Sequence, residues 1–162
     1  IQSGGTEIVS ASCTGINTVV SSGGALNVLS GGLADPTTIF TGGNEVISKG
    51  GTDLGALVSG GAQTVLGLAS GASVFSGGVE TVSSGGTASG TIVSSGGQEV
   101  VLSGGLASGG TVGLGGSLDV SAGGSAITRP GRQSLSRRRP EALLIASTAG
   151  RRSLSIHALS KT

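Results

Sequence analysis

The amino-acid sequence predicts an all-β fold, a parallel β-helix (β-solenoid) built from 19-residue rungs and followed by a basic tail. Three observations lead to this prediction: evenly spaced Gly-Gly pairs, two columns of β-branched residues at constant phase, and very few large side chains. Repetition at a fixed period of this length is typical of solenoids, in which each repeat buries its apolar face against its neighbours.

The Gly-Gly pairs define the rung. In the most regular stretch the first glycines of successive pairs are Gly77, Gly85, Gly96, Gly104, Gly115 and Gly123. The steps therefore alternate between 8 and 11 residues, which makes a 19-residue repeat with a short half and a long half. Glycine supplies the positive φ or the close backbone approach that a tight corner needs, so each rung is expected to contain two corners.

Two columns of β-branched residues predict stacked strands between these corners. The short half contributes Val9, Val28, Ile47, Val65, Val82, Val101 and Val120. The long half contributes Val20, Ile39, Val58, Val74, Val93 and Val112. Stiff β-branched side chains suit a pleated surface and pack on identical neighbours one rung away. Six to seven rungs at about 4.8 Å each would form a rod about 30 Å long.

The composition also suits a thin core. The chain contains 34 Gly and two Phe, and it lacks Trp, Tyr and Met. Such a composition is also typical of disordered low-complexity segments, and that alternative stays open at this point. The two Val/Ile columns favour the solenoid, because a disordered chain has no reason to keep them in phase.

Two successive rungs depart from the period. A residue is missing before Gly60, Leu66-Gly67 replaces a Ser-Gly-Gly corner, and two further residues are lost from the short half. The phase recovers at Val74. We therefore expect a tightened corner rather than a break in the rod.

Polar residues in the short half form a further column, two positions before the first Val column. This row consists of Glu7, Glu45, Gln63, Glu80 and Glu99. We expect it on the outer surface, either as a solvated row that keeps the rod soluble or as a cation-binding or receptor-facing interaction stripe. The nonapeptide calcium repeat with its regular aspartate is absent, which favours the solvated row.

Catalytic and cofactor chemistry find little support. Cys13 replaces a corner glycine and has no partner cysteine, so a small residue tolerated at a corner is favoured over a reactive or metal-binding thiol. The single histidine, His157, lies in the tail, far in sequence from any serine or acid of the repeats that could complete a triad. No His/Cys spacing matches a metal site and no glycine cluster matches a phosphate-binding loop. We therefore predict no enzyme activity, no cofactor and no metal.

The composition changes abruptly after the last glycine pair, which divides the chain into a repeat domain at 1–126 and a tail at 127–162. Residues 1–126 carry seven acids against Lys49, net −6, and the tail carries eight bases against Glu141, net +7. The tail is expected to be mostly irregular, with a short helix near 140–149 because proline starts and glycine ends that stretch. It lacks aromatic residues for stacking on bases, so nucleic-acid binding is not predicted. We expect the tail instead to cap one end of the rod, where exposed strand edges would otherwise favour association.

The repeats resemble those of the AIDA-I/antigen 43 type of autotransporter passenger. The resemblance covers roughly residues 1–126 and is carried by segments such as residues 82–105, VSSGGTASGTIVSSGGQEVVLSGG. It implies a right-handed β-helix, secreted and displayed at the bacterial cell surface, that acts in adhesion, self-association or biofilm formation. In that family serines can carry O-linked heptose, so the exposed corner serines Ser22, Ser84 and Ser95 become candidate glycosylation sites. No translocator barrel follows residue 126 in this sequence, so the resemblance is to a passenger segment, and membrane contact is expected only through such a barrel.

The predicted function is therefore structural and adhesive. A repetitive face would make many weak contacts to like molecules or to host-surface glycans and proteins, and these contacts would sum by multivalency. The alternative is a scaffold or an ice-binding-like solenoid, since Thr18, Thr37 and Thr91 lie two residues before the second Val column and could order water. An enzyme that cleaves polysaccharides ranks third.

Overall fold

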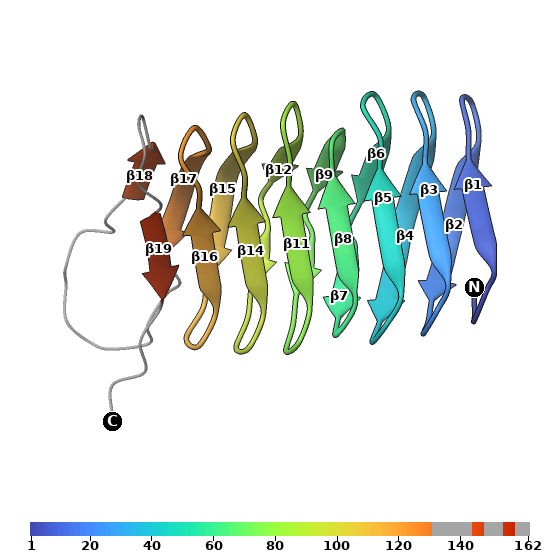
Figure 1. Cartoon of the computed structure of the whole chain (residues 1–162), viewed down its shortest axis with the longest axis horizontal. Coiled ribbons are helices and arrows are strands. Elements are labelled where there is room, and N and C mark those ends of the chain that lie inside the picture. Colours follow the sequence, from blue (N-terminus) through green and yellow to red (C-terminus); the bar gives the residue numbers. More distant parts are fainter. Residues whose placement is uncertain (131–143, 148–153, 158–162) are drawn as a thin grey trace.

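In the computed structural model the chain forms a rod of stacked rungs, which confirms the predicted all-β parallel solenoid. The structure describes residues 1–130, 144–147 and 154–157. Figure 1 shows the strands side by side along the rod, with the N-terminal rung at one end and β18 and β19 at the other. Two sheets run the whole length of the rod. The buried side chains packed between them form its interior, called the lumen below.

The short halves of the rungs build the first sheet, of eight strands. In spatial order these are β1 (Thr6–Val9), β3 (Ala25–Val28), β5 (Asn44–Ile47), β8 (Ala62–Val65), β11 (Val79–Val82), β14 (Gln98–Val101), β16 (Ser117–Val120) and β19 (Leu154–His157). All neighbours except β16 and β19 are parallel.

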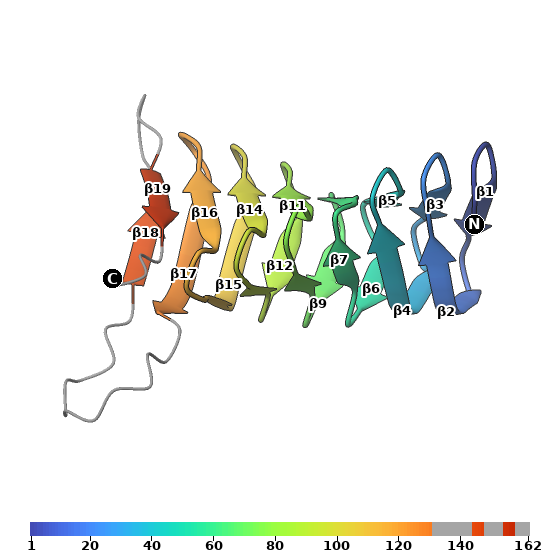
Figure 2. The ribbon, with the colours of Figure 1, turned by 90° about the horizontal axis from the view of Figure 1, so that it is seen from below.

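The long halves build the second sheet, of eleven strands, which Figure 2 shows from below. Its long strands are β2 (Thr14–Val20), β4 (Leu33–Phe40), β15 (Leu106–Val112) and β17 (Ser125–Pro130). In the middle rungs a glycine divides the long half into two short strands: β6 (Thr52–Leu54) and β7 (Leu57–Ser59), β9 (Leu68–Ser70) and β10 (Ser73–Val74), β12 (Thr87–Ser89) and β13 (Ile92–Val93). β18 (Leu144–Ser147) completes the sheet.

The strand register follows the sequence period. Val82 lies opposite Val101, 19 residues later, whereas Ile47 pairs with Val65 and Val65 with Val82, at offsets of 18 and 17 residues. The ladder nevertheless continues without interruption through these two irregular rungs. The expectation of a tightened corner instead of a break is confirmed.

Both predicted Val/Ile columns face the lumen and are buried. A column of small residues from the second sheet, which was not predicted from the sequence, also lies in the lumen: Ala34, Ala69, Ala88, Ala107 and Ala126. Burying one valine side chain contributes roughly 1.5–3 kcal/mol, so repetition supplies a core without aromatic residues. Small side chains on one wall leave room for longer ones from the other.

The Gly-Gly corners combine two different backbone requirements. Gly85 has φ +82°, a conformation that side chains with a Cβ rarely adopt. At Gly86 an ideal Cβ would lie 2.1 Å from the carbonyl oxygen of Val65 in the preceding rung. The first glycine therefore turns the chain, and the second allows one rung to stack closely on the next.

The C-terminal end of the rod carries antiparallel strands. β17 pairs in parallel with β15 as far as Pro130, so the last parallel strand extends beyond the predicted boundary at residue 126. β18 then pairs antiparallel with β17, and β19 with β16. The predicted helix is wrong for residues 144–147, which form β18, because the free edge of β17 offers backbone hydrogen bonds that override the local preference. The rest of that predicted helix lies outside the described residues.

Removing residues 131–162 should cause end-to-end association, since it deletes β18 and β19 and exposes the backbone edges of β16 and β17. Solution scattering should then show elongated oligomers that grow with concentration. Replacing Arg137, Arg138 and Arg139 by serine removes charge but keeps both strands, so this control should behave like the full chain. A truncated chain that stays monomeric would contradict the capping role.

Candidate functional site

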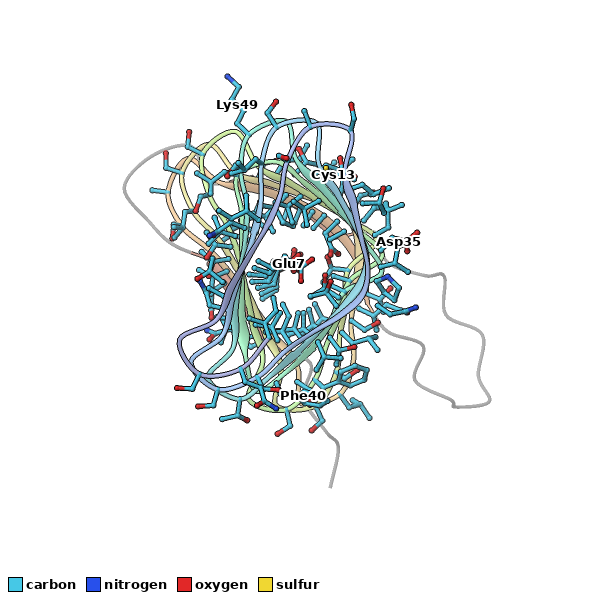
Figure 3. The ribbon with its side chains drawn as sticks, turned by 90° about the vertical axis from the view of Figure 1, so that its right-hand side faces the viewer. Glu7, Cys13, Asp35, Phe40 and Lys49 are labelled. Atoms are coloured by element: carbon cyan, nitrogen blue, oxygen red, sulfur yellow. The ribbon has the colours of Figure 1, made fainter. Side chains whose placement is uncertain are left out.

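The polar row predicted on the outer surface lies inside the rod, so that placement is wrong. Glu45, Gln63 and Glu80 are 0% exposed and Glu99 is 1% exposed, while Glu7 in the first rung is half-buried. Figure 3, viewed from one end of the rod, shows oxygen atoms within the lumen beside Glu7. The reason is the period of two along a strand: Glu45 and Ile47 are two residues apart and therefore share the inward face. A row buried in this way cannot be a receptor-facing stripe.

One group of these side chains makes a hydrogen-bonded cluster in the lumen. Gln63 Nε2 donates to Glu45 Oε2 at 2.8 Å, and Thr37 Oγ1 donates to Glu45 Oε1 at 3.3 Å. Asp53, also fully buried, accepts a hydrogen bond from the backbone N–H of Ala56 at 3.1 Å. Asp53 was not identified from the sequence, although it shares the position of the alanine column.

Burial and mutual repulsion act on the two acids of this cluster. Burial raises the pKa of Glu45 well above its ordinary value, and the neighbouring negative charge of Asp53 raises it further. Burial also raises the pKa of Asp53, and the hydrogen bond with Glu45 lowers it in part. Two carboxyls in this position hold a proton between them, because both cannot ionise without water or a cation nearby.

A second group, Glu80, Glu99 and Thr91, has unsatisfied oxygens. Both carboxyl oxygens of Glu80, Oε1 of Glu99 and Oγ1 of Thr91 are buried without a hydrogen-bond partner. Burial raises the pKa of Glu80 to about 7, while the Thr91 hydroxyl, which lies near Glu80 without hydrogen-bond geometry, acts in the opposite direction. Burial together with repulsion from Glu80 raises the pKa of Glu99 well above its ordinary value. Asp53 Oδ2 and Gln63 Oε1 of the first group are also buried without a partner. Buried polar groups normally have partners, so the middle of the lumen is unusual.

The threonine row that suggested an ice-binding surface also points inward. Thr18 is 8% exposed, Thr37 0% and Thr91 1%. Thr18 Oγ1 lies 3.4 Å from Glu7 Oε1, as Thr37 does from Glu45 at 3.3 Å, so these hydroxyls face the acids across the lumen. The alternative of an ice-binding face on this row is wrong, because the hydroxyls cannot reach bulk water.

The predicted glycosylation sites lie on the surface, at the corners. Ser22, Ser84 and Ser95 are all exposed. Each stacks against the first glycine of a corner in the next rung: Ser22 beneath Gly42, Ser84 beneath Gly104 and Ser95 beneath Gly115. Ser3, Ser30, Ser76 and Ser103 occupy equivalent corner positions. The corners thus present serine hydroxyls at the spacing of the rungs, about 4.8 Å.

The outer faces of the sheets combine apolar and small polar side chains. Exposed hydrophobic residues include Ile16, Phe40, Leu57, Phe75 and Ile92. Ser70, Ser89 and Ser108 are stacked in register on β9, β12 and β15. Figure 3 shows Phe40, Asp35 and Lys49 directed away from the lumen. These faces are what the rod offers to a partner.

Cys13 is exposed in the first rung, with its Sγ 3.8 Å from Ser10 Oγ. One rung further, a Cβ at the equivalent Gly32 would lie 2.3 Å from the carbonyl oxygen of Val9. At Cys13 the described structure places no such carbonyl against the side chain. This agrees with a residue tolerated at a corner and gives the thiol no described metal or disulfide partner.

Within residues 1–130, 144–147 and 154–157, no three or more His, Cys, Asp or Glu side chains come together in a way that could bind a metal ion. The same residues include no helix with the length and apolar character needed to cross a bilayer. The consecutive arginines at 137–139 lie outside the described residues.

No protein-family model and no curated protein sequence matches the chain. Among solved structures, it matches the crystal structure of the TibC-catalysed, hyper-glycosylated fragment TibA55-350. The two are 33% identical with a TM-score of 0.61, and the match covers 78% of this chain and 54% of the TibA fragment, so the chain spans about half of that neighbour. TibA is an autotransporter adhesin of the AIDA-I type. In fold and in sequence, the chain is therefore similar to an AIDA-I-type adhesin passenger, in agreement with the resemblance of its repeats.

Proposed function

We propose that this solenoid is an adhesive, non-enzymatic segment displayed outside a bacterial cell. The observation that carries the proposal is the similarity to the TibA passenger fragment, combined with surface columns that repeat in register on both sheets. Its partners are like molecules or glycans and proteins of a host surface. Each contact is weak, and a regular array of them sums by multivalency.

The corner serines support a second part of the proposal, that Ser22, Ser84 and Ser95 accept sugars. They are exposed and stacked at glycine corners, and the TibA fragment was glycosylated by TibC. Co-expression with TibC followed by mass spectrometry tests this directly. We expect added hexose- or heptose-sized masses on peptides containing these residues, and their absence from a triple serine-to-alanine variant. Modification restricted to other residues would overturn the assignment.

Adhesion itself is tested by displaying the full chain on a non-aggregating bacterial strain. Cells that carry the rod should settle faster from a standing culture and form more surface-attached biofilm than cells with an empty display anchor. As a further control, Gly86→Ala weakens the stacking of two adjacent rungs, so cells that carry this variant should settle more slowly than cells with the native rod. Settling that is equal for the rod and the empty anchor would contradict self-association, and a parallel assay on immobilised host glycans would then test the other class of partner.

A further inference from the structure

We propose that the solenoid takes up protons as its middle rungs close, so that the pH of the surroundings controls whether the lumen around Glu80 and Glu99 can form. The inference starts from their positions. Glu80 on β11 lies directly opposite Glu99 on β14 in a parallel ladder, with the strands about 4.8 Å apart. Both side chains are sealed from solvent, at 0% and 1% exposure.

Among residues 1–127, whose side chains the structure describes, nothing positively charged faces this pair. On the first sheet, Gln63 on β8 precedes Glu80 and the apolar Leu118 on β16 follows Glu99. The facing wall of the second sheet supplies alanines and Thr91. The negative charge of Asp53 on β6 acts on Glu80, and Glu45 on β5 acts in turn on Asp53. Asp119 follows Leu118 on β16 and is half-buried. Among the described side chains Lys49 is the only cation, and it is exposed at a corner. Every charged neighbour is therefore an acid.

The three unpartnered carboxyl oxygens of Glu80 and Glu99 then have to be neutralised in another way. A proton from solvent adds to a carboxylate oxygen and forms a neutral carboxyl, whose O–H can donate to a neighbouring oxygen. A metal ion is disfavoured, because the described residues bring together no three acidic, histidine or cysteine ligands. The raised pKa of both acids, caused first by burial, agrees with this account.

A solenoid grows by adding rungs to an existing end, so the protons enter when the rung that buries both acids is added. While β11 forms the end of a growing rod, the Glu80 carboxylate still contacts water and remains ionised. Docking of β14 buries Glu80 and Glu99 together, so proton uptake coincides with the addition of that rung. Raising the pH then opposes this step more than the addition of a rung without a buried acid, such as the one that brings Leu118 into the lumen.

The sign of the pH dependence is fixed. The pKa of Glu80 rises from 4.5 to about 7 on folding, so the folded state binds the proton more tightly than the unfolded chain. Below about pH 4.5 both states are protonated, and Glu80 does not change the free energy of unfolding. Between these values the folding equilibrium constant falls by about tenfold per pH unit for each such group, and the loss is complete above the folded-state pKa.

The test compares the full chain with a variant carrying Glu80→Gln and Glu99→Gln, by urea unfolding followed by circular dichroism from about pH 4 to pH 8. For each protein we take the ratio of the folding constant at about pH 8 to that at about pH 4. This ratio should be at least about a hundredfold larger for the variant than for the native chain. Asp35→Asn removes one exposed carboxylate and is the matched control, with no expected change in the pH slope. Equal slopes for the native chain and the double variant would overturn the proposal.

Two further measurements keep the proposal testable if the double variant folds poorly. Refolding of the native chain near pH 6, measured by calorimetry in buffers of different ionisation enthalpy, should take up about two or more protons. Refolding without proton uptake would overturn the proposal. Millimolar calcium, with chelator as its control, should leave the stability at about pH 8 unchanged, whereas a large stabilisation would assign the site to a cation instead.

Discussion

Replacing Gly86 by alanine is expected to destabilise the solenoid by about 3 kcal/mol or more, at the upper end of the cost of overpacking. The added Cβ would lie 2.1 Å from the carbonyl oxygen of Val65, and that oxygen belongs to the backbone of the neighbouring rung and cannot rotate away. Relief requires the two rungs to separate, which lengthens the hydrogen bonds on both sides of the corner. Thermal or urea unfolding followed by circular dichroism measures the loss.

Gly113 provides the matched control for this substitution. It also lies at a corner, but its φ is not positive and an ideal Cβ would lie 3.3 Å from the nearest atom, the carbonyl oxygen of Val93. Gly113→Ala should therefore cost less than about 1 kcal/mol, because a shift of a few tenths of an ångström relieves the contact. If both alanine variants lose the same stability, close rung stacking is not the reason for the second glycine.

Replacing Glu99 by leucine is expected to stabilise the rod, by about 2 kcal/mol or more at about pH 8, because a buried acid without a counter-ion is exchanged for an apolar side chain. The structure shows that leucine fits this column: Leu26 and Leu118 occupy equivalent positions and are 0% exposed. Leu118 lies directly beside Glu99 in the ladder, so the new side chain would pack against an existing one. Urea unfolding at constant pH measures the gain.

Glu7→Leu serves as the control, since it makes the same substitution in the same column. Glu7 is half-buried in the first rung and faces the Thr18 hydroxyl at 3.4 Å, so its carboxylate retains solvent and a polar neighbour. Its replacement should change the unfolding free energy by less than about 0.5 kcal/mol. A loss of stability in Glu99→Leu would mean that the buried acids are needed to set the packing of the lumen.

The rung length, both Val/Ile columns and the glycine corners were predictable because each repeats a local physical requirement many times. A β-branched residue at one position says little, but seven in phase, from Val9 to Val120, require a strand. The two successive rungs that together lack three residues were also predictable, since the phase returned at Val74.

The side of the sheet on which the polar row lies was not predicted, although the spacing along the strand indicates it. Glu80 and Val82 are two residues apart in one strand, so a buried Val82 implies an inward Glu80. The general rule that acids lie outside predicts the opposite side, and in this strand the alternation decides. Asp53 was missed because its column is otherwise alanine, and β18 was missed because the strand edge that forms it comes from a distant part of the chain.

The ladder between rungs has a mechanical consequence for the adhesive role proposed above. Each parallel interface pairs four residues in the first sheet and five or six in the second. A pull along the axis loads these interfaces in series, so every one bears the full tension and the rod parts at the weakest, which at high pH would be the interface between β11 and β14. Added rungs would extend the reach of such a tether without raising the force at which it parts.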